Sequence, residues 1–251
     1  QTDERRVIWV VGASSGIGLA LTGQLLEQGH KVIASSRNEA SLIKFYARYP
    51  ECFHFVRCDV THMEKVQQSV AQIRALIGYV DTLIFNAGIC EYIDKGNVDS
   101  ALIESVFDTN FFGLTRLIES ARELIRPHTG AQIAAVSSSA AYIPLPRAEA
   151  YGASKAAMTY FMHSLRLGLK TKGISVNVIS PGFVKTPLTD KNDFPMPMMI
   201  SETTAANAII RGLQHNRSDI HFPRRFTYFL KFLGLLPINI QQALTKRTGQ
   251  P

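Results

Sequence analysis

The chain has 251 residues, of which 46% are hydrophobic and 19% are charged, and it carries a net charge of +7. This length and balance are typical of one α/β domain and exclude a largely disordered chain, so we expect a single domain over residues 1–251. The lysines and arginines are spread along the sequence without a nucleic-acid-binding motif. A nucleic-acid partner is therefore not expected.

The cysteines and histidines give no sign of a disulfide framework or a metal site. Cys52, Cys58 and Cys90 form no C-x-x-C pair, and we interpret them as packing residues of a reduced, intracellular protein. The histidines lack metal-ligand spacing, so we expect no metal. No secretory signal precedes the first apolar run, and no run approaches the roughly 18 apolar residues of a membrane span. We therefore expect a cytoplasmic location.

In chain order, short apolar runs alternate with longer helical patterns. The runs predict strands at Val7–Val11, Lys31–Ser35, Cys52–Cys58, Thr82–Phe85, Gln132–Ser137 and Ser175–Ile179, with a shorter seventh at Asp219–Phe222. The longer patterns predict helices at Gly16–Gln28, Glu39–Tyr49, Met63–Ile77, Ala101–Ile125, Tyr151–Lys172 and Ser201–Gln214. Such alternation predicts a Rossmann-type α/β fold, a doubly wound parallel sheet of about seven strands with helices on both faces.

Two helix starts carry capping signals. Thr61 followed by Glu64 predicts a capping box, and Ser201 is a favourable N-cap residue.

The stretch 185–200 breaks the regular pattern. Its helix breakers and flexible apolar side chains are Pro187, Pro195, Pro197, Met196, Met198 and Met199. Long loops in compact domains often cover binding sites, so residues 185–215 are a candidate substrate loop or lid. An equally good interpretation is that the methionines pack the loop onto the core.

A glycine-rich turn, Gly12-Ala13-Ser14-Ser15-Gly16-Ile17-Gly18, joins the first predicted strand to the first predicted helix. Glycine lets the backbone approach a pyrophosphate closely, and the helix N-terminus adds N–H groups and a favourable dipole. The spacing is G-x-x-x-G-x-G rather than the fingerprint G-x-G-x-x-G, so a merely tight connection stays open. The βαβ setting favours a phosphate-binding turn.

Tyr151 and Lys155 lie four residues apart on a predicted helix, so their side chains point the same way. An ammonium beside a phenol stabilises the phenolate and lowers the pKa of the tyrosine, as a general acid/base near neutral pH requires. Ser138, flanked by Ser137 and Ser139, ends an apolar run and could hydrogen-bond the same substrate oxygen. Taken alone, the tyrosine–lysine spacing also occurs on solvated helix faces.

In their order, these residues resemble the classical short-chain dehydrogenase/reductase family over roughly residues 5–190. The glycine turn matches the family's T-G-x-x-x-G-x-G motif, with Val11 in place of the threonine. The other matches are Asn86-Ala87-Gly88 to N-A-G, Asn110 to the active-site asparagine, Ser138 to the catalytic serine, Tyr151 and Lys155 to Y-x-x-x-K, and Pro181-Gly182 with Thr186 to P-G-x-x-x-T.

The resemblance implies a catalytic set of Asn110, Ser138, Tyr151 and Lys155. Ser138 and Tyr151 would hydrogen-bond a carbonyl, Tyr151 would exchange its proton, Lys155 would also reach the nicotinamide ribose, and Asn110 would hold a water linking Lys155 to solvent. The expected cofactor-binding residues are Gly12, Ser14, Ser15, Gly16, Ile17, Gly18, Ser36, Arg37, Asp59, Val60, Asn86, Ala87, Gly88, Tyr151, Lys155, Pro181, Gly182, Val184 and Thr186. The family also implies a homodimer or homotetramer joined through helices 101–125 and 151–172.

The end of the second predicted strand indicates which nicotinamide cofactor binds. An acidic residue there holds the ribose of NAD, whereas an arginine suits the 2′-phosphate of NADP. The chain has Ser36 and Arg37 instead of a carboxylate, so we expect NADP(H), unless Arg37 pairs with Glu39 or faces water. The resemblance places Asp59 at the adenine edge.

Residues 222–251 are rich in aromatic and basic side chains. A basic amphipathic helix lies on an anionic membrane or covers an apolar cleft, whereas packing on the sheet or at a subunit interface is the plainer alternative. With the methionine-rich loop, the segment indicates an apolar ketone or secondary alcohol as substrate. We expect an NADPH-dependent carbonyl reductase. An NAD-dependent alcohol dehydrogenase, a non-catalytic nicotinamide sensor and a membrane-associated interaction protein remain alternatives.

Overall fold

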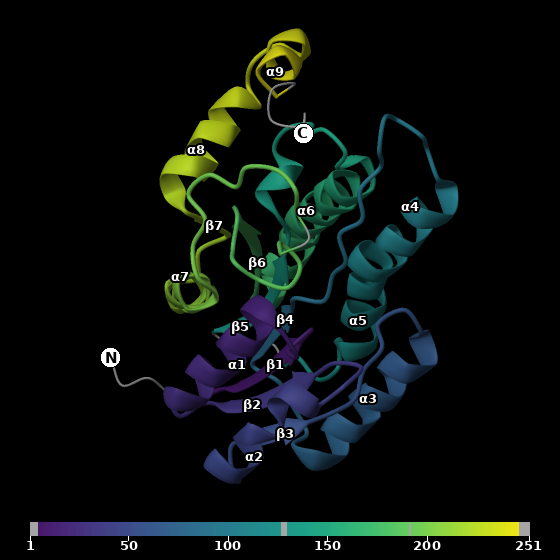
Figure 1. The fold of residues 1–251 in the computed structure, drawn as a ribbon. Helices are drawn as coiled ribbons and strands as arrows, with labels where there is room; N and C mark the ends of the chain where they lie inside the picture. The colour runs from purple at the N-terminus through teal and green to yellow at the C-terminus, as the bar shows by residue number, and fades with distance from the viewer. Residues whose placement is uncertain (1–4, 127–129, 191, 246–251) are drawn as a thin grey trace.

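A seven-stranded parallel sheet forms the middle layer of the computed structural model, which describes residues 5–126, 130–190 and 192–245 (Figure 1). The strands are β1 (Val7–Val11), β2 (Lys31–Ser35), β3 (Phe53–Phe55), β4 (Thr82–Phe85), β5 (Ala131–Val136), β6 (Ile174–Pro181) and β7 (Asp219–Phe222). Their order is β3-β2-β1-β4-β5-β6-β7, so the direction of winding reverses between β1 and β4. The predicted doubly wound fold is confirmed.

Helices cover both faces of this sheet. They are α1 (Gly16–Glu27), α2 (Lys44–Arg48), α3 (Met63–Leu76), α4 (Ser100–Phe107), α5 (Gly113–Ala121), α6 (Glu149–Leu169), α7 (Glu202–Gln214), α8 (Arg224–Leu233) and α9 (Ile238–Thr245). Alternate residues of β1 supply the two cores. Trp9 packs with α3, α5 and α6, whereas Val10 packs with α1 and α7. Because both faces are covered, every residue of β1 is buried, as a central parallel strand requires.

Several boundaries differ from those predicted. The third strand is limited to Phe53–Phe55, although the N–H groups of Val56 and Cys58 still donate to carbonyls at the end of β2 and just beyond it. The predicted helix Glu39–Tyr49 divides into a 3₁₀ turn and the short α2. The capping box at Thr61 is wrong, because the Thr61 hydroxyl donates to Asp59 at 2.7 Å and His62 is the N-cap residue.

The predicted helix Ala101–Ile125 is interrupted by a π-helical turn at Asp108–Phe112 and ends at Ala121. In that turn the N–H of Gly113 donates to the carbonyl of Asp108, five residues back. The Arg116 side chain stabilises the turn by donating to the carboxylate of Asp108 at 2.6 Å. By contrast, Ser201 caps α7 as predicted, since its hydroxyl accepts from the N–H of Thr204 at 3.1 Å.

The topology brings the predicted site segments to one edge of the sheet. The glycine-rich turn follows β1, Asn86 follows β4 and Ser138 lies just beyond β5, while Pro181 ends β6. In a parallel sheet these carboxyl ends meet at the same edge, and ligands bind there at the point where the winding reverses.

Candidate active site

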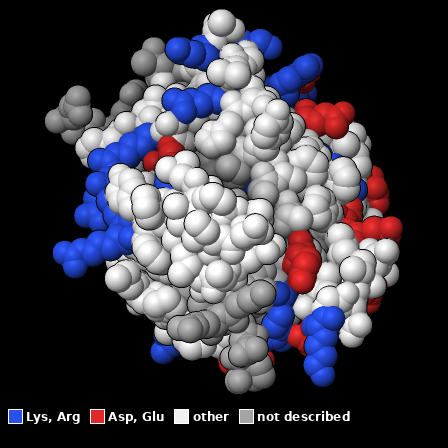
Figure 2. All heavy atoms as spheres, turned by 90° about the horizontal axis from the view of Figure 1, so that it is seen from above, with Lys and Arg blue, Asp and Glu red and all other residues white. Residues whose placement is uncertain are grey.

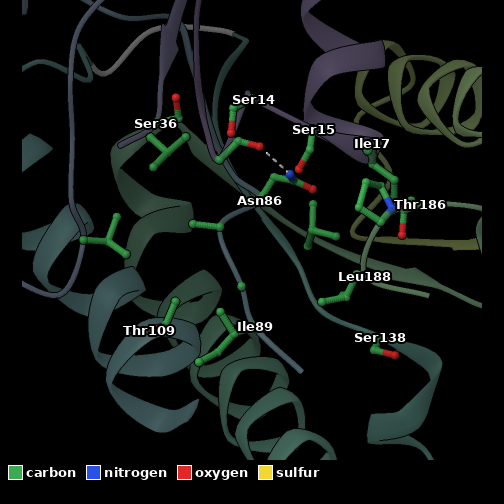
Figure 3. A pocket seen from close by; sticks show the side chains of 18 of the residues that line it. Ser14, Ser15, Ile17, Ser36, Asn86, Ile89, Thr109, Ser138, Thr186 and Leu188 are labelled. Carbon is green, nitrogen blue, oxygen red and sulfur yellow. Dashed lines mark hydrogen bonds between the residues drawn. The ribbon is translucent and has the colours of Figure 1, made fainter. Parts of the chain in front are cut away.

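A cavity of about 370 Å³ opens at this edge of the sheet. Ser14 and Ser36 lie toward one end of it and Ser138 toward the other (Figure 3). Among the predicted site residues, the following line it: Gly12, Ser14, Ser15, Gly16, Ile17, Ser36, Arg37, Asp59, Val60, Asn86, Ala87, Gly88, Ser138, Tyr151, Lys155, Pro181, Gly182, Val184 and Thr186. Gly18 and Asn110 are not part of this lining and lie behind it.

The glycine-rich turn is packed directly against the segment that follows β4. Gly12 has a φ of +86°, and a Cβ on it would lie 2.4 Å from the backbone nitrogen of Ala87. The Asn86 side-chain amide donates to the Gly12 carbonyl at 2.7 Å, the bond drawn in Figure 3. A Cβ on Gly18 would lie 2.1 Å from that same carbonyl oxygen. The two motifs therefore form one interlocked unit, in which Gly18 allows close packing.

The rim beyond β2 carries the residues predicted to select the cofactor. Arg37 is exposed there, and no carboxylate in the described ranges pairs with it. Glu39 instead lies beside Tyr46, where burial and then Glu39 raise the pKa of the tyrosine. The Ser36 hydroxyl donates to the carbonyl of Asn38 and keeps its lone pairs as acceptors.

Asp59 lies farther along the same wall. Burial by itself would raise the pKa of Asp59, but hydrogen bonds from the Thr61 hydroxyl and N–H hold it below the ordinary value. Asp59 therefore presents a carboxylate to the cavity near neutral pH.

Ser138, Tyr151 and Lys155 come together at the inner end of the cavity. Ser138 caps a 3₁₀ turn, its hydroxyl accepting from the N–H of Ala140 at 3.1 Å, and it also hydrogen-bonds Tyr151. Lys155 is buried, and its ammonium donates to the carbonyl of Val136 at 2.8 Å and lies 5.7 Å from the centre of the Tyr151 ring.

The three consecutive serines have different surroundings. The Ser137 hydroxyl donates to the carbonyl of Lys155 at 3.0 Å and is 2.7 Å from the hydroxyl of Thr159, so it is used within the core. Ser139 is buried in the 3₁₀ turn. Ser138 is thus the serine whose hydroxyl lies beside Tyr151.

The pKa values of this pair differ from the sequence expectation. Burial raises the pKa of Tyr151, and the nearby Cys90 thiol raises it further, while the hydrogen bond to Ser138 lowers it. Burial lowers the pKa of Lys155 to about 8. The predicted lowering of the Tyr151 pKa by Lys155 is therefore wrong for this arrangement, because removal of the phenol from solvent disfavours the phenolate.

Asn110 projects from the π-helical turn and is fully buried. Its amide donates to the Ile89 carbonyl and to the Ser154 hydroxyl, both at 3.0 Å, and its Oδ1 accepts from the Ile89 N–H at 2.8 Å. A Cβ on Gly88 would lie 3.2 Å from Asn110 Oδ1 and 3.4 Å from Lys155 Nζ. Asn110 therefore fixes the backbone beside the lysine.

Sequence reasoning missed several residues of this site. Ile89, Thr109 and Leu188 line the cavity, and Leu188 belongs to the loop interpreted as a lid (Figure 3). Cys90, interpreted as a packing residue, lies close enough to raise the pKa values of both Tyr151 and Lys155. In the sequence, the position of Cys90 directly after the N-A-G motif and Ile89 could have indicated that it lies near the site.

Comparison with known proteins agrees with this arrangement. A model of the short chain dehydrogenase family matches residues 6–195. An uncharacterized oxidoreductase of Myxococcus xanthus is 28% identical over 96% of this chain and 97% of its own length. The 3-oxoacyl-(acyl-carrier-protein) reductase of Buchnera aphidicola is 31% identical over 82% of this chain and 88% of its own.

A solved short chain dehydrogenase from Burkholderia cenocepacia, in complex with NADP, has the same fold. It superposes with a TM-score of 0.83 at 24% identity, covering 99% of both chains. The family match spans most of the sequence and includes every segment that lines the cavity. The chain is therefore an oxidoreductase of the short-chain dehydrogenase family.

Proposed function

We propose that this oxidoreductase uses NADP(H) to interconvert a carbonyl group and a secondary alcohol of an apolar substrate, with Tyr151 as general acid/base. The observation that carries the proposal is a single cavity. It has the glycine-rich turn and Arg37 toward one end and Ser138, Tyr151 and Lys155 at the other. A dinucleotide and the acid/base group can therefore share one continuous site.

The cavity fits a nicotinamide dinucleotide. Gly16 adopts a φ of +54° at the start of α1, where a Cβ would lie 3.2 Å from the Thr186 side chain, and the N–H groups of a helix start favour phosphate. Arg37 supplies a planar fork for a 2′-phosphate, and no carboxylate at the end of β2 competes for it. Two solved relatives of the same fold are described with NADP bound, which supports this cofactor.

The residues at the inner end can exchange a proton with a substrate oxygen. When bound, the nicotinamide supplies or accepts the hydride. Ser138 and Tyr151 donate hydrogen bonds to the substrate oxygen, and Tyr151 passes its proton to that oxygen during reduction. The raised pKa leaves Tyr151 protonated near neutral pH, the form that donates a proton to a carbonyl oxygen. Lys155, with a pKa of about 8, can take up or release a proton nearby.

Asn110 acts in this scheme by positioning. Both of its amide donors are used by Ile89 and Ser154, so only the second lone pair of its Oδ1 is left to hold a water beside Lys155. A water relay to solvent remains a proposal that rests on the family resemblance.

Apolar side chains support an apolar substrate. Ile89 and Leu188 line the cavity, and Met198 and Met199 on the 185–200 loop are 55% and 44% exposed rather than packed onto the core. The Buchnera relative is named for a reaction on a 3-oxoacyl group. We therefore propose that residues 185–215 form the substrate loop of a single catalytic domain.

We also propose that the protein is a homo-oligomer joined through α5 and α6 and their flanking turns. Tyr160 and Leu167 on α6 are 79% and 78% exposed, and Phe112, just before α5, is 47% exposed. Large apolar side chains at such exposure favour contact with another copy.

The test is a panel of ketones, aldehydes and alcohols of increasing apolar length, assayed with NADPH and NADH. Tyr151→Phe is expected to abolish turnover while NADPH still binds. Arg37→Gln is expected to reduce the preference for NADPH about 10- to 100-fold, the worth of a charge-assisted hydrogen bond. Arg48→Gln, at an exposed arginine paired with Glu27, is the control. A wild type that binds NADPH without turnover on the panel, or an active Tyr151→Phe variant, would contradict the proposal.

A further inference from the structure

Helix α8 presents three aromatic side chains to solvent. Tyr228, Phe229 and Phe232 are 57%, 56% and 60% exposed, and Leu235, just after the helix, is 83% exposed. We call these four residues the aromatic face. Isolated exposed apolar residues are ordinary, but an adjacent group of large ones marks a contact surface.

The orientation of α8 is fixed by its other side. Leu230 and Leu233 are buried against Ile143, and Lys231 forms an ion pair with Asp219 of β7. Thr227 is fully buried, and its hydroxyl lies 2.7 Å from His221 Nδ1. The aromatic face therefore points outward because the opposite side of the helix already packs on the domain. The alternative prediction, that the C-terminal segment packs on the domain, holds only for the side of α8 that carries Leu230 and Leu233.

Helix α9 also carries exposed apolar side chains. Ile238, Ile240 and Leu244 are 49%, 46% and 51% exposed. Figure 2 looks down on the end of the molecule where α8 and α9 lie in Figure 1. It shows a broad uncharged area with lysine and arginine side chains along one border and most acidic side chains on the other side.

The charged side chains of the C-terminal segment are all basic. Five lysines and arginines and no aspartate or glutamate follow Asp219 in the sequence. Arg224 and Arg225, at the start of α8, are exposed. Helical spacing places both on the side that carries the aromatic face. Two further basic residues, Lys246 and Arg247, lie outside the described residues.

We propose that the aromatic face, with Arg224 and Arg225, binds the surface of an anionic lipid bilayer. Aromatic rings partition into the headgroup region, and each nearby arginine is attracted to anionic lipid. A symmetric contact with a second copy fits less well, because it would bring the same arginines of both copies together without an acid on either segment. None of the helices in the described part of the chain has the length and hydropathy of a membrane span.

If the proposed function holds, membrane binding through this surface would also serve substrate access. Phe226, on α8, contacts Phe183 with ring centres 5.6 Å apart, and a Cβ on Gly182 would lie 2.9 Å from the Phe226 ring. Gly182 lines the cavity. Binding through α8 therefore holds the Gly182 side of the cavity close to the bilayer, which can supply an apolar substrate.

The proposal is tested by vesicle co-sedimentation of the full chain, without any activity measurement. The probes are vesicles of phosphatidylcholine alone and of phosphatidylcholine mixed with phosphatidylglycerol. Arg224→Gln/Arg225→Gln should reduce partitioning onto the mixed vesicles about twenty-fivefold, at about fivefold for each arginine. Phe229→Ser/Phe232→Ser should reduce it on both kinds of vesicle.

Matched controls exist elsewhere on the chain. Ile43→Ser/Leu76→Ser removes apolar side chains that are 56% and 54% exposed, and Lys170→Gln/Lys172→Gln removes two exposed charges. Both controls should bind as the wild type does, and unchanged circular dichroism establishes that every variant is folded. No binding of wild type to the mixed vesicles overturns the proposal. So does binding that the α8 variants leave unchanged, or a loss of oligomer, by light scattering, in those variants alone.

Discussion

Substitution by alanine at two glycines of α1 should have opposite effects on the stability of the protein. A Cβ on Gly18 would lie 2.1 Å from the Gly12 carbonyl oxygen and 2.6 Å from the Asn86 amide nitrogen. The first contact is with backbone, which cannot rotate away. A Cβ on Gly23 would lie 3.4 Å from the nearest atom, in the Phe45 ring, which is ordinary van der Waals contact.

The magnitudes follow from these distances. Gly18→Ala must displace the glycine-rich turn or break the 2.7 Å hydrogen bond between Asn86 and Gly12. Overpacking costs about 1–3 kcal/mol and the lost bond about 1 kcal/mol more, so we expect a destabilisation of about 3 kcal/mol. Gly23→Ala gains helix propensity without a clash and should stabilise the protein by about 0.5–1 kcal/mol.

Urea denaturation followed by circular dichroism measures both free energies, and fluorescence titration with NADPH measures binding. Gly18→Ala should also weaken NADPH binding at least tenfold, because the turn it displaces lines the cavity, whereas Gly23→Ala should leave binding unchanged. A Gly18→Ala variant as stable as wild type with unchanged NADPH affinity would refute the view that the two motifs interlock. A Gly23→Ala variant less stable than wild type would show that these Cβ distances do not predict the stability of alanine variants.

Two further predictions concern the loop and the buried pair. Arg147 has a φ of +65° and forms ion pairs with Asp94 at 2.7 Å and Asp193 at 2.6 Å. Arg147→Gln should therefore increase amide hydrogen exchange in residues 192–200. Unchanged exchange would show that these ion pairs do not hold the loop in place. The pKa of Lys155 is lowered to about 8, so the unfolded chain binds more protons above that pH and stability should rise from pH 8 toward pH 10. Above pH 10 the raised pKa of Tyr151 makes unfolding release its proton, so stability should fall again; Lys155→Met should abolish only the rise, as urea denaturation across this range would show.

The doubly wound parallel sheet and most of the cavity lining could be predicted because motifs at strand ends converge wherever a sheet is parallel. The helix expected at Ala101–Ile125 could not be predicted in detail. Its apolar spacing is compatible with a continuous helix, and only the hydrogen bond from Gly113 to Asp108 reveals the π turn. That turn carries Asn110, the residue that fixes Ile89. The spacing of hydrophobic residues does not reveal that one helical turn contains an extra residue.

The Tyr151–Lys155 spacing shows where sequence reasoning ends. Four residues on a helix do place both side chains toward one cavity, but spacing carries no information about solvent. Both side chains line the cavity beside the 86–90 segment. Tyr151 is half-buried there, whereas Lys155 is buried and its ammonium is held by the Val136 carbonyl. Burial disfavours the charged form of each group, so it raises the pKa of Tyr151 and lowers that of Lys155. The protein therefore holds Tyr151 as a neutral phenol at neutral pH, the protonated form from which a proton can pass to a substrate carbonyl.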